Sequence, residues 1–266
     1  MASALVKDNT PNSMTKDKQI TIPITILECP PMKIFSIRFY KNGKVSKDVL
    51  AEQLDKILKR KIKFPKKSTL KVDSIKKEDY DDVSLIMYSQ VKKTNIKKKP
   101  DLAEIGIKGT LDEKLEYVKS ILNKEIFVSD VFEKGQILDV RGLTTGRGFQ
   151  GPVKRFGITL KKAKSEKGRR RPGSLGPWHP ARVTFRVPMA GQLGMFTRVH
   201  YNQKIMGIGK AENNFKNIKN YGDIKTDYLL VKGSVQGPSK RQLLITHPLR
   251  QSKKQLKKNY EFLELK

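Results

Sequence analysis

The sequence predicts a mainly β protein with an α/β insertion and a long basic internal finger. Short alternating apolar runs, separated by Gly, Pro or Asn turns, occur toward both ends of the chain and favour a closed antiparallel β-barrel. Between them, residues 44–125 combine strand-like runs with two helical spacings, as in an inserted α/β subdomain. Residues 142–182 hold 11 Lys or Arg against one acid, Glu166, and have too little apolar surface to fold alone.

The N-terminal part reads as strands of the barrel. Residues 2–7 are a short strand candidate. Residues 19–28 (QITIPITILE) alternate Ile with Thr or Pro, which predicts a second strand with Pro23 at an edge or bulge. A Pro-Pro turn leads to a third alternating strand at residues 32–40, and KNGK at residues 41–44 predicts a tight turn.

After this turn the apolar spacing becomes helical, which predicts a helix over residues 46–60. Its apolar stripe consists of Leu50, Leu54, Ile57 and Leu58. Residues 68–75 and 83–91 are strand-like. A second helix is expected to begin at Thr110, because Thr110 and Glu113 have the spacing of a capping box.

Strand signals resume before the basic segment, at residues 125–132 and 136–142. Further alternating runs follow it at residues 182–188, 197–209, 227–235 and 242–247. The last stretch, residues 251–266, predicts a short surface helix. These transitions divide the chain into a first barrel part (1–43), the α/β subdomain (44–125), barrel strands (126–141), the basic finger (142–182), the remainder of the barrel (183–249) and a C-terminal tail (250–266).

Composition points to a polyanionic partner. The chain has 56 basic and 26 acidic residues, a net charge of +30, which favours nucleic acid first and an anionic membrane surface second. It has no 18-residue apolar run and no signal-peptide core. The single cysteine, Cys29, excludes an internal disulfide and fits a buried structural role in a reducing cytoplasm. With only His179, His200 and His247 besides, no metal site or other cofactor is expected.

Glycines dominate the start of the basic segment. Gly146, Gly148 and Gly151 form a GxGxxG string, but no helical pattern follows it and the spacing does not fit a P-loop. We interpret it as slim backbone that approaches RNA phosphates closely, with a plain flexible loop as the alternative. The Arg-rich run at residues 161–171 suits phosphate binding, although such runs are also common on solvated faces.

The only tryptophan, Trp178, lies between Pro177 and Pro180 near the end of this segment. A rigid loop that presents an indole can stack on bases, worth about 1–3 kcal/mol per base. Packing against the parent domain is the alternative. His179 has no sequence partner for general-base chemistry, so the sequence does not predict an enzyme.

Several segments resemble the archaeal and eukaryotic form of the large-subunit ribosomal protein L-three family. They are ITIPITILECPPMKIFSIRFY (20–40), DVFEKGQILDVRGLTTGRGFQGPVKRFGI (130–158), RRRPGSLGPWHPARV (169–183), GQLGMFTRVHYNQKIMGIG (191–209) and GSVQGPSKRQLLI (233–245). They follow the family's order over nearly the whole chain.

The resemblance implies a six-stranded barrel similar to the second domain of translational elongation factors, with an inserted α/β subdomain. It also implies a basic finger that runs into large-subunit rRNA toward the peptidyl-transferase centre, with Trp178 at its tip. The implied role is structural and assists rRNA assembly, and the implied partners are large-subunit rRNA and neighbouring large-subunit proteins. The alternative is an RNA-modifying or nucleotide-dependent enzyme that uses the Gly-rich loop and His179.

The residue pattern and the resemblance together predict a set of RNA-binding residues. They are Thr145, Gly146, Arg147, Gly148, Gln150, Lys154, Arg155, Lys161, Lys162, Lys164, Lys167, Arg169, Arg170, Arg171, Trp178, His179, Arg182, Lys240 and Arg241. Family members usually have a basic extension and a first barrel segment before the region that matches Met1. The expectation is therefore a truncated chain, a start placed late, or a separate polypeptide that supplies the N-terminal part.

Overall fold

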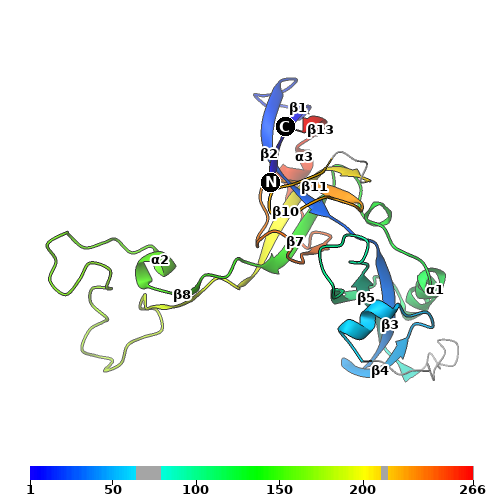
Figure 1. The fold of residues 1–266 in the computed structure, drawn as a ribbon, viewed down its shortest axis with the longest axis horizontal. Helices are drawn as coiled ribbons and strands as arrows, with labels where there is room; N and C mark the ends of the chain where they lie inside the picture. Colours follow the sequence, from blue (N-terminus) through cyan, green and yellow to red (C-terminus); the bar gives the residue numbers. More distant parts are fainter. Residues whose placement is uncertain (64–78, 211–214, 266) are drawn as a thin grey trace. The chain divides into compact units, whose positions relative to one another are not determined.

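The computed structural model describes residues 1–63, 79–210 and 215–265 and confirms the mainly β class (Figure 1). The chain divides into two compact units. The first comprises Met1–Leu138, Asn202–Ser234 and Pro248–Lys266, and the second comprises Asp139–Tyr201 and Val235–His247.

A seven-stranded sheet has the order β12-β7-β10-β11-β2-β1-β13. Its strands are β1 (Ala2–Asp8), β2 (Gln19–Glu28), β7 (Ile137–Leu143), β10 (Thr197–Gly209), β11 (Tyr228–Lys232), β12 (Leu244–Thr246) and β13 (Tyr260–Leu265). Among the strands that the structure describes, no pairing joins the edge strands β12 and β13. Closure of the sheet into a six-stranded barrel therefore remains a prediction.

Part of the first unit's core lies on β1, β2, β10 and β11. Its buried side chains are Ala4, Val6, Ile22, Ile24, Met206 and Leu230. The alternation seen in the sequence produces this core, because every second residue of a strand points to the same face.

Pro23 lies within β2, which has neighbours on both sides. The β11 ladder ends at the pair Lys232↔Ile24, and Pro23 lies opposite Gly233 at the next position. The carbonyl of Pro23 accepts the N–H of Gly233 at 2.8 Å, but Pro23 has no N–H to return the bond. The Gly233 carbonyl accepts the Thr25 hydroxyl at 2.6 Å instead.

The helix predicted for residues 251–266 is largely wrong. A short helix, α3 (Lys253–Lys257), is followed by β13, which pairs antiparallel with β1. Tyr260, Phe262 and Leu265 pack against the core of the sheet, so the apolar period of this stretch is that of a strand. The buried Lys204 ammonium donates to the carbonyl of Lys258 and lies 3.4 Å from that of Gln255, which anchors the end of α3.

A four-stranded sheet has the order β4-β3-β5-β6. It consists of β3 (Met32–Lys41), β4 (Lys44–Leu50), β5 (Asp82–Ser89) and β6 (Leu102–Gly106). The helix α1 (Leu111–Ile121) packs its buried Leu115 and Val118 into the apolar cluster of this sheet. The predicted capping box is confirmed, because the Glu113 carboxylate accepts the N–H of Thr110 at 3.1 Å.

The helix predicted for residues 46–60 is wrong. Asn42 and Gly43 have φ values of 51° and 70°, as a two-residue hairpin turn requires, and β4 returns along β3. Only the short 3₁₀ helix η1 (Lys56–Arg60) forms after it. The helical spacing arose because Leu50 ends a strand while Leu54 and Leu58 reach an apolar cluster with Phe35 and Tyr88. The expected start of the α/β subdomain, at residue 44, thus falls inside the β3–β4 hairpin. The strand expected at residues 68–75 lies outside the described residues.

The strand predicted for residues 125–132 is also wrong. It is limited to one bridge between Met32 and Ile126, and the 3₁₀ helix η4 (Val128–Asp130) follows. The Asp130 carboxylate accepts the N–H of Phe127 at 2.9 Å. Such a local side-chain bond to the backbone competes with strand pairing.

Cys29 is partly buried rather than fully buried. Burial raises the pKa of its thiol to about 12, and the charges of Asp227 and Glu28 add to the effect. The thiol is therefore kept protonated at neutral pH, in agreement with an inert structural role.

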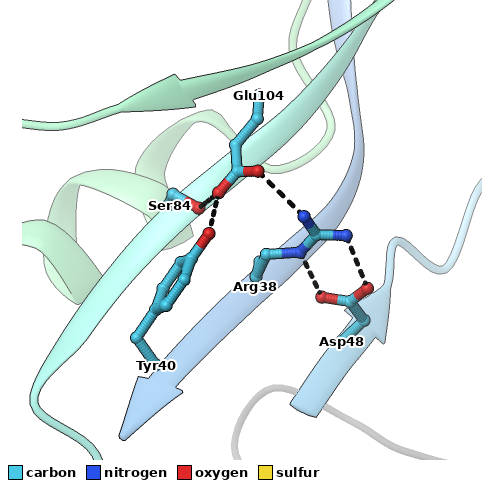
Figure 2. Close-up of polar contacts among 5 residues, drawn as sticks. All are labelled: Arg38, Tyr40, Asp48, Ser84 and Glu104. Carbon is cyan, nitrogen blue, oxygen red and sulfur yellow. Dashed lines mark hydrogen bonds and ion pairs between the residues drawn. The ribbon is translucent and has the colours of Figure 1, made fainter. Parts of the chain in front are cut away.

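A network of polar side chains lies on the face of the four-stranded sheet opposite α1 (Figure 2). Arg38 Nε lies 2.9 Å from Asp48 Oδ1, and its Nη1 lies 2.8 Å from Glu104 Oε2. Glu104 also accepts hydrogen bonds from Ser84, at 2.6 Å, and from Tyr40. These hydrogen bonds, with that of Ser84 the strongest, hold the pKa of Glu104 below its usual value.

We expect Glu104→Gln to lower the free energy of unfolding at pH 7 by about 1 kcal/mol, a modest figure because water reaches the site. The lowered pKa means that the carboxylate stabilises the fold above its unfolded pKa and loses this effect as pH falls through the folded pKa. Urea unfolding from pH 7 to pH 3 should show the difference from wild type shrinking toward acid. The control is Glu116→Gln, an exposed position on α1, and an equal effect there would contradict the prediction.

Candidate nucleic-acid interface

The finger is held at its base by strand-like contacts within the second unit. The name finger is used from here on for residues 144–196, a longer range than the 142–182 predicted from the sequence. These bounds are set by two hydrogen bonds: the Thr144 N–H donates to the Phe196 carbonyl at 3.0 Å, and the Phe196 N–H donates to Thr144 Oγ1 at 3.1 Å. Beyond this pair, β8 (Gly148–Gln150) and β9 (Gly191–Leu193) form a short antiparallel ladder. Figure 1 traces the chain between α2 and β9 as one long irregular loop.

Gly194 is required where the two sides of the base cross. Its φ is +83°, and a Cβ there would overlap the Thr145 carbonyl oxygen and lie 2.9 Å from Gly146 Cα. Close approach of the two chains allows the Arg147 N–H to donate to the Leu193 carbonyl at 2.9 Å. Gly194 lies in the 191–209 segment that carries the resemblance, but it was not predicted as a site residue because its role depends on contacts with residues 145–147.

A short helix, α2 (Pro152–Phe156), follows the glycines although the sequence analysis expected none. Pro152 starts it and Gly157, at φ 69°, ends it. Arg155 points from α2 onto the returning chain. Its Nη1 donates to the Met189 carbonyl at 2.9 Å and its Nε to the Gln192 carbonyl at 3.2 Å. Arg155 therefore holds the two sides of the finger together.

Arg241 braces the start of the finger in a similar way. Its Nη1 donates to the Thr144 carbonyl at 2.8 Å and lies 3.3 Å from the Leu143 carbonyl. The neighbouring Lys240 is exposed, with φ 68°. Of the two residues predicted here to bind RNA, Arg241 stabilises the base of the finger and Lys240 faces solvent.

Between α2 and the tip, residues 161–169 close a small loop. The Lys161 N–H donates to the Arg169 carbonyl at 3.2 Å, and Arg169 Nε donates to the Lys161 carbonyl at 3.1 Å. Lys167 and Gly168, with φ values of 60° and 91°, turn the chain. The loop presents several lysines to solvent, and Arg169 serves as both a bracing residue and an exposed cation.

The predicted RNA-binding residues separate into two groups by exposure. Gln150, Arg155 and Arg241 are half-buried, and each donates to backbone carbonyls of this unit. The exposed members are Thr145, Gly146, Arg147, Gly148, Lys154, Lys161, Lys162, Lys164, Lys167, Arg169, Arg170, Arg171, Trp178, His179, Arg182 and Lys240.

In the part of the chain that the structure describes, no ion pair neutralises a cation of the finger. The described ion pairs lie between residues 33 and 125. Clustered, exposed cations repel each other and favour a polyanion.

Trp178 is 87% exposed. Packing against the parent domain, the alternative reading of this residue, would have buried the indole. Before it, Ser174 Oγ accepts the Gly176 N–H at 3.2 Å and lies 3.3 Å from the Gly176 carbonyl, which gives the approach to the tip a fixed bend. The indole is thus available for a flat ligand.

The strand predicted for residues 182–188 is wrong. The Val187 N–H donates to the Thr184 carbonyl at 3.2 Å, so Phe185 and Arg186 are the central residues of a β-turn. The alternation of Val183, Phe185 and Val187 produces no strand here because no partner strand lies beside it in the described residues.

Three exposed aromatic residues of the finger were not predicted as binding residues. Phe185 is 104% exposed, Phe149 is 77% exposed and Phe156 is 52% exposed. Phe156 follows Arg155 and Phe185 precedes Arg186, and an aromatic residue beside an arginine in a basic segment is the signal that can identify a stacking platform. Phe149 has no arginine next to it.

In the described residues, no group of three or more His, Cys, Asp or Glu is placed to hold a metal ion. None of the helices in the described ranges is long and apolar enough to cross a membrane.

Comparisons with known proteins show which family the sequence matches. The family model described as Ribosomal protein L3 matches residues 1–266. The chain is 39% identical to large ribosomal subunit protein uL3 of Methanocaldococcus jannaschii, covering 94% of this chain and 79% of the relative. It is 40% identical to the uL3 protein of Archaeoglobus fulgidus, covering 95% and 80%, and 39% identical to that of Methanobrevibacter smithii, covering 96% and 81%.

The base of the finger depends on Gly194. We expect Gly194→Ala to weaken the base by about 1–3 kcal/mol, because the new Cβ overlaps backbone at a left-handed φ. Hydrogen exchange at the Arg147 amide measures this loss directly. Gly173→Ala is the matched control, since nothing lies within 4 Å of a Cβ there. Unchanged protection in Gly194→Ala would contradict this account of the base.

Proposed function

The chain belongs to the ribosomal protein L3 family, and on this premise we propose that its finger binds large-subunit rRNA and extends toward the peptidyl-transferase centre. The family is structural and non-enzymatic, so the protein is a structural constituent of the archaeal-type large ribosomal subunit in the cytoplasm. Its partners are rRNA and other large-subunit proteins. The enzyme hypothesis is therefore wrong.

One observation carries the proposal: a braced loop bears many exposed cations, none of them in an ion pair of the described residues, together with an exposed Trp178. If six to ten of these cations meet phosphates, affinity falls about 10³–10⁵-fold between 50 and 200 mM salt. This charge supplies affinity without sequence specificity. Stacking by Trp178 adds a contact that depends on bases rather than on phosphate.

The basic residues of this unit fall into two groups according to their contacts. Arg155 and Arg241 donate to carbonyls and shape the finger, while Lys154 and the lysines of the 161–169 loop face solvent. We assign phosphate binding mainly to the exposed cations. The half-buried pair contributes by holding the two sides of the finger in one arrangement.

A role in rRNA assembly follows from the same charge. Cations that repel each other in the free protein are neutralised only when several RNA segments surround the finger. Folding of the rRNA around it is then coupled to binding. The findings do not support a separate polypeptide for the N-terminal part, and we do not propose one.

Sucrose-gradient fractionation tests the central proposal. The chain should sediment with the large subunit, and its absence there would refute the proposal.

We expect Trp178→Ala to reduce the peptidyl-transfer rate of assembled ribosomes by about 5-fold or more, consistent with a lost stacking contact. The melting temperature of the isolated protein should stay unchanged, because the indole is 87% exposed. A large fall in melting temperature with normal ribosomes would contradict this role.

Because Lys154 faces solvent and Arg155 binds backbone carbonyls, we expect substitutions at these two positions to change RNA binding in different ways. Lys154→Gln should lower the slope of log K against log salt by about one, because it removes one phosphate contact. Arg155→Gln should leave the slope nearly unchanged but loosen the β8–β9 ladder, because its donors bind the carbonyls of Met189 and Gln192. Binding titrations with large-subunit rRNA and hydrogen exchange of the ladder separate the two. Equal slope changes would show that Arg155 also contacts phosphate.

A further inference from the structure

We propose that Phe185 is a second base-stacking residue of the finger, presented by its own turn on the returning side of the loop. The proposal rests on the rRNA-binding function argued above and adds a contact to it. No motif or resemblance selected this residue.

The turn fixes how Phe185 is presented. The bond from the Val187 N–H to the Thr184 carbonyl, at 3.2 Å, places Phe185 and Arg186 at the two central positions of the turn. Side chains at these positions project outward from the chain reversal. A preceding turn, in which the Arg182 N–H donates to the Pro180 carbonyl at 2.7 Å, separates Phe185 from Trp178. Trp178 and Phe185 therefore lie on opposite sides of this turn in the same loop.

The ring of Phe185 is fully exposed to solvent. Phe185 is 104% exposed, compared with 87% for Trp178, so its side chain has essentially no packing within the protein. Covering an exposed benzyl side chain with a partner stabilises the complex, because it removes apolar surface from water. Phe185 makes no contribution to a core, which removes the usual structural reason for an apolar residue.

Charge favours RNA as the partner. From Lys167 to Lys210 the sequence has no Asp or Glu, and Arg182 and Arg186 lie on either side of Phe185 in the sequence. A base offers a flat π-surface to Phe185, and the adjoining phosphates offer bidentate acceptors to the guanidinium groups. An apolar pocket on a neighbouring protein has no need for flanking arginines, so the surroundings favour a nucleotide.

The experiment compares two probes with the full-length chain. One is a single-stranded oligouridylate and the other is an abasic ribose-phosphate oligomer of equal length. Phe185→Ala should weaken binding to the oligouridylate by about 5–150-fold. Binding to the abasic oligomer and the salt slope should not change, because stacking requires bases and releases no counterions. Phe185→Tyr should restore affinity, whereas Phe185→Leu should not.

Met14→Ala is the control for loss of an exposed apolar side chain, since Met14 is 96% exposed and lies between β1 and β2. It should bind both probes like wild type. Equal losses on the two probes would assign Phe185 a structural role and overturn the proposal. Unchanged binding to both probes would also overturn it and favour a protein neighbour as the occupant. If wild type fails to bind large-subunit rRNA, the proposed function itself fails, a result distinct from any difference between the variants.

Discussion

Positive charge without internal counter-charge is the constraint on which the finger depends. A loop of this charge cannot be held by a hydrophobic core, because it has too little apolar surface, nor by ion pairs, because acids are nearly absent from it. The structure uses arginine-to-carbonyl hydrogen bonds instead. Arg155, Arg169 and Arg241 each donate to backbone oxygens, so the same residue type that provides charge also provides shape.

The four-stranded sheet differs from the finger in how its charged side chains are paired. The sheet concentrates the ion pairs, including the Arg38 network with Asp48 and Glu104. The finger has a single acid, Glu166, and no ion pair of the described residues includes one of its cations. The protein thus combines a folded part that has internal ion pairs with a basic part whose charge suits a polyanion, which is the arrangement expected of a ribonucleoprotein component.

Local signals were confirmed where the interaction itself is local, whereas apolar spacing alone wrongly predicted a helix at residues 46–60 and strands at residues 125–132 and 182–188. The Asn42-Gly43 turn and the capping box at Thr110 were identified because each depends on a few adjacent residues. The strand β13 was missed because its partner, β1, is distant in sequence. In the finger, the charge and the single Trp178 were visible from the sequence, whereas the exposure of Trp178 came from the structure. The bracing role of Arg155 was not, because it depends on carbonyls more than 30 residues away.

The pairing of β1 with β13 has a consequence for biosynthesis. Ala4 is opposite Leu265, so one side of β1 has no partner until almost all of the sequence has been translated. At roughly 5–20 residues per second, this interval lasts on the order of 10–50 s. During that time an unpaired strand edge is open to wrong partners, which makes a nascent-chain chaperone or rapid capture by nascent rRNA valuable to this protein.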